Sequence, residues 1–300
     1  MKDLYVSRVG RASALIARKE PVVYGAGQYA QALDADQLQD YERNGFIVLD
    51  AVFDADEIQA LREEVDTMSA DPDIRALDEA IYEPGSDTLR SIFRIHELGE
   101  RLADLPRDPR VLDVARQILG SEVYIHQSRA NMKPGFEGKE FYWHSDFETW
   151  HVEDGMPGMR AVSCSILLND NDACNGPLML IPGSHRQFVA CVGETPEDNY
   201  RTSLRKQEVG VPDTLSLSLL SEQAGVTPVI ARAGSVVFFD CNTLHGSSGN
   251  ISPRARNNLF MVYNSVDNAL LAPFHGLAPR PEHIAARERC VTLSPLAVHP

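Results

Sequence analysis

The 300-residue sequence predicts an α+β fold that is mainly β, a β-sandwich or jelly roll buttressed by helices. Helical patterns come first, and after residue 120 the chain changes to short apolar stretches separated by turn residues. With 43% hydrophobic and 24% charged residues, the composition is typical of a globular protein. Since no internal repeat or low-complexity tract occurs, we expect one domain over residues 1–300.

The first third of the chain supplies the predicted scaffold helices. Residues 1–32 lack clear periodicity and are expected to form an irregular arm. An aspartate in a capping position marks the start of each of three helices, which follow Asp34, Asp54 and Asp108. Glycines close the first and third helix, because glycine adopts the left-handed backbone that ends helices at little cost.

Strand patterns dominate the rest of the chain. They cover residues 46–49, 91–96, 123–131, 141–151, 161–168, a short stretch within 176–185, 235–240 and 256–263. The polar segment 186–228 is weakly periodic, as an excursion or lid over a barrel mouth would be. The tail 272–300 is rich in proline, with a short helical pattern at 282–289 as its only periodic feature.

The aromatic stretch 141–151, Phe-Tyr-Trp-His-Ser-Asp-Phe-Glu-Thr-Trp-His, holds the main candidate site. In an extended chain, side chains two apart share a face, so His144 and Asp146 would project together. His245, expected in the loop after strand 235–240, is the best third partner. Two imidazoles and one carboxylate form the facial triad of non-haem Fe(II) oxygenases, although a surface histidine beside a solvated carboxylate is the simpler alternative.

Two further strands carry polar side chains on one face. On the strand at 123–131 these are Gln127, Arg129 and Asn131, which line either a pocket or a solvated edge. The strand at 256–263 places Arg256, Asn258 and Phe260 on one face. The sequence therefore offers polar groups that can converge on a ligand.

Charge and cysteine content limit the partners. Lysine and arginine total 28 against 43 acidic residues, and the net charge of −15 argues against nucleic acid or an anionic membrane as the main partner. The five cysteines include no Cys-x-x-Cys pair, so free thiols are expected. No segment approaches eighteen apolar residues, and the first residues lack the apolar core of a signal peptide, which predicts a cytoplasmic protein.

Several motifs together resemble the phytanoyl-CoA dioxygenase superfamily. They are Asn-Gly-Phe-Ile-Val-Leu at 44–49, His-Ser-Asp at 144–146, Asn-Gly-Pro-Leu-Met-Leu-Ile-Pro-Gly-Ser-His at 175–185, and His-Gly-Ser at 245–247 followed by Arg256. The longer run 141–157 is similar to the signature of ectoine hydroxylases, and the resemblance extends from about Leu33 into the C-terminal region. A run of this length is more specific than a metal triplet alone.

The resemblance implies a double-stranded β-helix core, jelly-roll and cupin-like, with Fe(II) bound by His144, Asp146 and His245. It implies hydroxylation of ectoine to 5-hydroxyectoine, in which O₂ and 2-oxoglutarate are consumed and succinate and CO₂ are released. Arg256 would hold the far carboxylate of 2-oxoglutarate through its guanidinium fork, with Arg254 as the alternative anchor. The weaker candidates for the co-substrate site are Ser247, Arg129, Asn131, Ser165 and Phe93.

Ectoine is a small zwitterion with an amidinium ring and a carboxylate, so its pocket should combine aromatic walls with hydrogen-bonding groups. The candidate walls are Trp150, Phe239 and Phe260, and the candidate polar contacts are Gln127, Thr149 and Asn258. The tail, with Arg280, either closes this pocket or packs in a homodimer.

Two alternatives stay open at this stage. A different hydroxylase of the superfamily, acting on an amino acid-like or acyl-carrier substrate, would keep the triad and Arg256 but change the pocket. A non-enzymatic metal-binding barrel would decarboxylate no 2-oxoglutarate. A halogenase is disfavoured, because that branch replaces the carboxylate ligand with a small residue and Asp146 is present.

Overall fold

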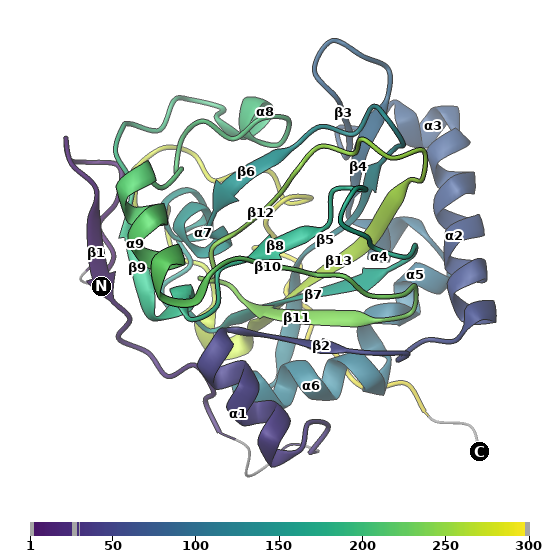
Figure 1. Cartoon of the computed structure of the whole chain (residues 1–300), viewed down its shortest axis with the longest axis horizontal. Helices are drawn as coiled ribbons and strands as arrows, with labels where there is room; N and C mark the ends of the chain where they lie inside the picture. The colour runs from purple at the N-terminus through teal and green to yellow at the C-terminus, as the bar shows by residue number, and fades with distance from the viewer. Residues whose placement is uncertain (1–2, 26–28, 30, 298–300) are drawn as a thin grey trace.

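Two antiparallel sheets face each other in the computed structural model, which describes residues 3–25, 29 and 31–297 (Figure 1). The larger sheet has the strand order β2-β11-β7-β13-β5-β4-β3, and the smaller has the order β10-β8-β12-β6. From β5 to β8, and again from β10 to β13, most successive strands alternate between the two sheets. This alternation is the winding of a double-stranded β-helix, so the predicted jelly roll with helices outside is confirmed.

The strands are short except for the two at the centre of the larger sheet, β5 and β13. Their bounds are β1 Ala14–Ala17, β2 Phe46–Leu49, β3 Ala80–Tyr82, β4 Leu89–Phe93, β5 Val123–Lys133, β6 Phe141–His144, β7 Ala161–Leu167, β8 Leu178–Leu180, β9 Gln187–Ala190, β10 Thr227–Pro228, β11 Val236–Asp240, β12 His245–Ser247 and β13 Arg256–Ser265.

The longer helices are α1, α2, α6, α7 and α9. The helical bounds are α1 Ala35–Asn44, α2 Ala55–Ala70, α3 Pro72–Arg75, α4 Ile95–Leu98, α5 Arg101–Asp104, η1 Leu105–Arg107, α6 Pro109–Leu119, α7 Asp146–Asp154, η2 Ser184–Arg186, α8 Tyr200–Ser203, α9 Thr214–Ala224 and η3 Val266–Asn268. None of the helices in the described part of the chain combines the length and apolar character needed to cross a membrane.

The predicted scaffold helices α1, α2 and α6 begin where their caps predict. Asp34 and Asp54 both form complete capping boxes, and the Asp108 side chain accepts from the backbone N–H of Arg110. Glycines in the left-handed region end α1 and α6. Local sequence is sufficient here, because each cap satisfies backbone donors of its own helix.

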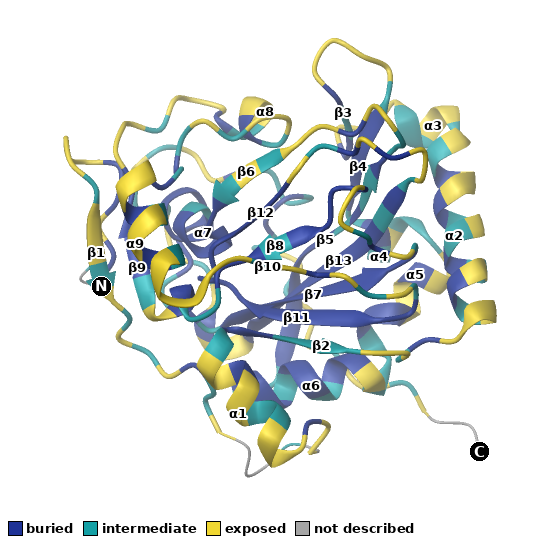
Figure 2. Cartoon of the chain, in the orientation of Figure 1, coloured by how far each residue is buried: buried dark blue, intermediate teal, exposed yellow. Residues whose placement is uncertain are grey.

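The larger sheet packs its two faces differently. One face packs against α2 and α6 in the main core, to which Leu61, Leu112 and Phe238 belong. The opposite face shares an apolar cluster with the smaller sheet, which includes Leu180 and Phe260. Figure 2 shows the central strands buried and the outer faces of the helices exposed. The site therefore lies between two sheets whose positions are fixed by burial of apolar side chains.

Three of the predicted segments are more regular than expected. Within the arm 1–32, β1 pairs with β9, so the arm is not wholly irregular; its residues 1–2, 26–28 and 30 lie outside the described residues. The segment 186–228 is not a single excursion, because β9 and β10 pair with other strands and only α8, α9 and their connections are free of a sheet. His245 lies in strand β12, not in a loop.

Three predicted elements are wrong in extent. The strand expected at 91–96 ends at Phe93, because Arg94 adopts a left-handed conformation and α4 follows. The tail forms turns at 282–289, not a helix. The strand expected over 141–151 ends at His144, because the side chain of Ser145 caps helix α7 by accepting from Glu148 N–H at 3.4 Å. Serine followed three residues later by glutamate is a helix-start signal, and it outweighs the aromatic content.

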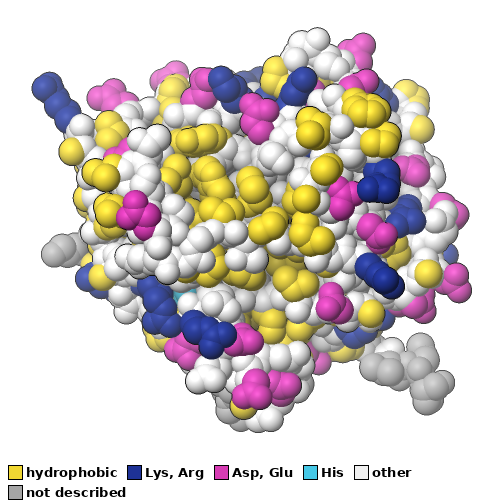
Figure 3. Space-filling model, in the orientation of Figure 1, with side chains coloured by type: hydrophobic (Ala, Val, Ile, Leu, Met, Phe, Trp, Pro, Cys, Tyr) yellow, Lys and Arg dark blue, Asp and Glu magenta, His cyan; other side chains and the backbone are white. Residues whose placement is uncertain are grey.

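Charges of both signs are scattered over the face shown in Figure 3, and hydrophobic side chains gather near its middle.

Candidate active site

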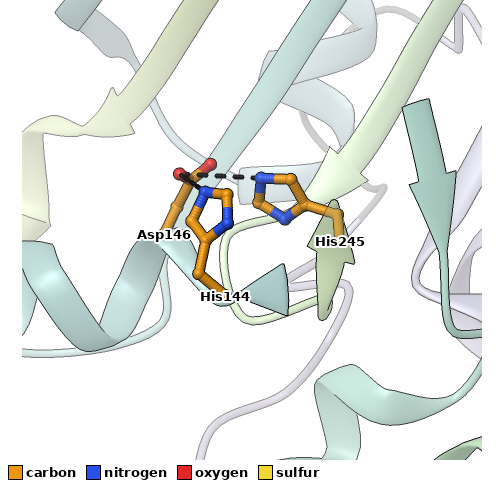
Figure 4. Close-up of side chains that lie close together, drawn as sticks. All are labelled: His144, Asp146 and His245. Atoms are coloured by element: carbon orange, nitrogen blue, oxygen red, sulfur yellow. Dashed lines mark ion pairs between the residues drawn. The ribbon is translucent and has the colours of Figure 1, made fainter. Parts of the chain in front are cut away.

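Three side chains converge between the two sheets. His144 ends β6, His245 begins β12, and the two residues face each other in the antiparallel ladder. Asp146 is the first residue of α7, so the Ser145 cap turns its carboxylate toward the histidines (Figure 4). Asp146 Oδ1 lies 3.7 Å from His144 Nε2 and 3.8 Å from His245 Nε2. The three residues are buried, and their ligand atoms lie within 4.8 Å of one another.

Backbone contacts fix the tautomer of both imidazoles. His144 Nδ1 lies 2.8 Å from the carbonyl oxygen of Tyr142, and His245 Nδ1 lies 2.9 Å from that of Thr243. A carbonyl oxygen only accepts hydrogen bonds, so each Nδ1 carries a proton, and in the neutral ring Nε2 is the nitrogen that keeps a lone pair. Both lone pairs belong to the nitrogens nearest Asp146, which is the form in which histidine binds a metal.

The ionisation states also suit a metal. Burial, followed by the neighbouring His245, lowers the pKa of His144 to about 3, so its imidazole is neutral near pH 7. Burial raises the pKa of Asp146, but the histidines and Arg129 outweigh burial and lower it overall. The Ser163 hydroxyl donates to Asp146 Oδ2 at 3.3 Å. Two imidazole nitrogens and one carboxylate oxygen are a donor set that fits Fe(II).

A pocket opens beside this group. Five of the six predicted co-substrate residues line it: Arg256, Ser247, Arg129, Asn131 and Phe93. Phe260, predicted as a substrate wall, also lies here. The sixth, Ser165, is fully buried and bonded by Asn258 Nδ2 at 3.2 Å, and neither residue lines the pocket.

Arg256 is buried without an acidic partner among the described residues. Its Nε and Nη2 donate to the carbonyl of Gly176 at 3.1 and 2.8 Å, and Nη1 donates to Asn131 Oδ1 at 3.2 Å. A guanidinium has five N–H donors, so each terminal nitrogen keeps one for a carboxylate. Burial, followed by nearby Arg90, lowers its pKa to about 10, and it stays charged at neutral pH. By contrast, Arg254 is exposed and pairs with Asp172.

A second, smaller pocket adjoins the first across Arg129, Phe141 and His144. It holds Gln127, Thr149 and Trp150, three of the predicted substrate residues. The Gln127 amide is held in place, since it donates to the carbonyl of Ile284 at 2.7 Å and accepts from Arg129 at 3.0 Å. Phe239 instead packs against the His245 ring with centroids 5.0 Å apart, so it supports the histidine and does not line either pocket.

Some pocket residues were not identified in the sequence. Arg90 lines the first pocket and Ser203 and Gln207 the second, while Leu204 borders both. Leu204 and Gln207 come from the segment predicted as a lid, and the Gln207 side chain donates to Thr149 at 3.3 Å. No periodicity distinguishes these residues. For Ser203, Leu204 and Gln207, the expected lid at 186–228 was the only signal in the sequence.

The tail lies against the second pocket through a buried ion pair. Arg280 lines this pocket, and its Nε and Nη2 donate to the two oxygens of Asp154 in α7 at 2.7 and 2.5 Å. The tail also supplies the Ile284 carbonyl to Gln127. The tail therefore contributes to the pocket of a single chain.

Asp154→Ala is expected to destabilise the fold by about 3 to 5 kcal/mol, because it leaves the buried Arg280 charge unpaired. Urea unfolding of both proteins measures the difference. Asp40→Ala is the control, since Asp40 and its ion-pair partner Arg43 are both exposed and the variant should unfold like the parent. Equal stability of the Asp154 variant and the parent would show that the Asp154–Arg280 ion pair does not stabilise the fold.

Comparison with known proteins identifies the family. Residues 41–258 match the family model of phytanoyl-CoA dioxygenase (PhyH). The chain is 63% identical over 295 residues to an ectoine dioxygenase of Bordetella bronchiseptica, with 98% of this chain and 96% of the relative covered.

Two solved structures of the same kind are also similar. The crystal structure of EctD from S. alaskensis with 2-oxoglutarate and 5-hydroxyectoine has a TM-score of 0.89 at 46% identity, with 98% of each chain covered. The structure of EctD from S. alaskensis with bound Fe has a TM-score of 0.88 at 45% identity and the same coverage. The chain therefore belongs to the phytanoyl-CoA dioxygenase family and, within it, to the ectoine dioxygenases.

Proposed function

We propose that this chain hydroxylates ectoine to 5-hydroxyectoine, with Fe(II) as its metal and 2-oxoglutarate and O₂ as co-substrates. One observation carries the proposal: a buried group of two histidines and one carboxylate lies beside a buried arginine that has no acidic partner among the described residues. The similarity to ectoine dioxygenases over nearly the whole chain supports the choice of substrate. One oxygen atom of O₂ enters ectoine and the other enters succinate, while CO₂ leaves.

The first pocket is the proposed site of 2-oxoglutarate. After its bonds to the Gly176 carbonyl and Asn131, Arg256 keeps one N–H on each terminal nitrogen for the far carboxylate, and a guanidinium can hold a carboxylate through two such donors. Ser247 lies next to this position, and Asn131 holds the guanidinium in its plane. The near end of the 2-oxo acid then faces His144 and His245, which line the same pocket.

His144, Asp146 and His245 are the proposed iron ligands. When bound, Fe(II) supplies the redox chemistry that couples decarboxylation of the 2-oxo acid to hydroxylation. With three protein ligands on one side, positions remain for the 2-oxo acid and for O₂. Burial of the site excludes water and protects the reaction from unproductive oxidation.

The second pocket is the proposed site of ectoine. Trp150 offers an aromatic wall for the amidinium ring, and Arg280 offers a cation for the carboxylate. Gln127 is already oriented by two hydrogen bonds, so substrate binding need not order it. Since the two pockets meet at His144, ectoine in one and 2-oxoglutarate in the other would both lie beside a proposed metal ligand.

Incubation with Fe(II), 2-oxoglutarate, O₂ and ectoine tests the function directly. The expected result is a product one oxygen atom heavier than ectoine and an equal amount of succinate. Proline under the same conditions is the comparison substrate. Succinate formed only with another small molecule would contradict the ectoine assignment, and no succinate with any substrate would favour a metal-binding barrel.

Trp150→Ala is expected to weaken ectoine binding by roughly 1 to 3 kcal/mol, or about ten- to a hundredfold, through lost aromatic burial and cation–π attraction. The KM for ectoine measures this loss. Iron content and the KM for 2-oxoglutarate serve as controls and should stay near normal. A folded variant with an unchanged KM for ectoine would remove Trp150 from the pocket.

We also propose that the enzyme works in the cytoplasm without a nucleic acid or membrane partner. The net charge of −15 and five unpaired cysteines support this, because free thiols suit a reducing compartment. The homodimer stays a prediction that light scattering of the purified protein would test.

A further inference from the structure

Lys133 is a buried lysine outside the set of residues that line the two pockets. It ends β5, two residues after Asn131, and is the ladder partner of Arg256 in β13. Only 4% of its surface is exposed. The mechanism described above gives no role to this side chain.

The contacts of Lys133 lead to the proposed co-substrate site. Its Nζ donates to Ser247 Oγ at 2.8 Å and to the carbonyl of Ser248 at 2.5 Å. In the part of the chain that the structure describes, no carboxylate lies within ion-pair distance of Nζ. The neighbouring charges are Arg256 on β13, Arg90 on β4, Glu83 before β4 and Glu140 before β6, and Glu83 already pairs with Arg90. A bound anion would offset the free-energy cost of burying a lysine and an arginine side by side.

The backbone is shaped around this side chain. A Cβ added at Gly138 would lie 2.2 Å from Lys133 Cγ, and one at Gly176 would lie 2.8 Å from Lys133 Cδ. Gly176 is also the residue whose carbonyl accepts from Arg256. Gly176 thus leaves space for the Lys133 side chain and accepts hydrogen bonds from Arg256, so one residue contacts both cations.

We propose that Lys133 is a positioning residue for the far carboxylate of 2-oxoglutarate, and that it acts through the Ser247 hydroxyl. An ammonium group only donates hydrogen bonds, so Ser247 Oγ accepts from it. The Ser247 proton is then free to point into the pocket beside the Arg256 fork. Lys133 thereby orients the Ser247 hydroxyl toward the carboxylate and places a positive charge behind it. This inference rests on the proposed function.

Co-substrate binding should also couple to proton uptake. Burial, followed by Arg256 and Arg90, lowers the pKa of Lys133 to about 6. An anion bound beside Arg256 and Ser247 favours the ammonium form and raises this pKa. The affinity for 2-oxoglutarate should therefore be highest below pH 6 and decrease as pH rises toward 8, by less than about tenfold per pH unit. His144 stays neutral throughout this range and does not contribute.

A double-mutant cycle tests the proposal. Binding of 2-oxoglutarate to iron-loaded protein under nitrogen is measured by calorimetry for the parent, Lys133→Met, Ser247→Ala and the double variant. Each single variant should bind about tenfold more weakly, and the double variant no more weakly than the weaker single one. Lys139→Met is the matched control, since Lys139 is exposed, and it should bind like the parent.

Two results would overturn the proposal: a Lys133→Met protein that binds 2-oxoglutarate like the parent, or losses that multiply in the double variant. The pH profile is an independent measurement that does not depend on how well a variant folds. The parent should lose affinity between pH 6 and 8, and a flat parent profile would also overturn the proposal. Failure of the parent to bind 2-oxoglutarate would instead refute the proposed function, so the two failures are distinguishable.

Discussion

Asp146→Ala is expected to reduce ectoine hydroxylation by about a thousandfold or more, because it removes the one anionic ligand of the proposed iron site. A ligated metal contributes several kcal/mol to lowering the barrier, and each 1.4 kcal/mol is about tenfold in rate. Among the described residues, no second carboxylate belongs to the group that Asp146 forms with the two histidines. Turnover and iron content, measured on the same sample, should decrease together.

Ser163→Ala is the matched control for this variant. Its hydroxyl donates to Asp146 Oδ2 at 3.3 Å but touches no proposed metal position. Loss of such an outer contact should cost about ten- to a hundredfold in metal affinity or activity, less than loss of the ligand itself. An Asp146→Ala protein with near-normal turnover would rule out the assignment of all three ligands.

Arg256→Lys should raise the KM for 2-oxoglutarate by on the order of thirtyfold, corresponding to about 2 kcal/mol for loss of the bidentate contact. Lysine keeps the charge but not the fork, and it cannot keep both hydrogen bonds to the Gly176 carbonyl. The KM for ectoine should change much less, because Arg256 does not line the second pocket.

Arg254→Lys is the comparison, since it makes the same chemical change two residues away. Arg254 is exposed and bonded to Asp172, so both KM values should match those of the parent. The opposite pattern, with a larger effect at Arg254 than at Arg256, would transfer the anchor to Arg254.

Several features of this protein follow from short stretches of sequence. Capping residues define α1, α2 and α6, because each cap bonds to the backbone of its own helix. Alternating apolar residues predict the strands, because successive side chains of a strand point to opposite faces and a buried face is therefore apolar at every second residue. The motifs at 141–157, 175–185 and 245–247 likewise predicted the family and the group of three side chains.

The sequence contains the signal for the change from strand to helix at Ser145, but the strand was predicted to continue through this residue. The spacing of Ser145 and Glu148 contains the helix signal, and the neighbouring aromatic residues favoured a strand. His144 and Asp146 still converge, but for a different reason than the shared face of one strand. A helix start next to a strand end directs both side chains into the same space (Figure 4).

Only the tertiary structure decided which side chains reach the site. Along β5 the alternation shifts at a bulge, where Gln127 and Ile125 pair with consecutive residues of β13 and His126 is left over. An extra residue in one strand turns every later side chain to the other face. Ile125 therefore packs in the main core, while Gln127 and Arg129 line the pockets. The burial of Arg256 and exposure of Arg254, the contact of the tail with Gln127 and the position of Lys133 beside two glycines depend in the same way on segments far apart in sequence. Their pairing is set by the packing of the whole chain, which no local pattern encodes.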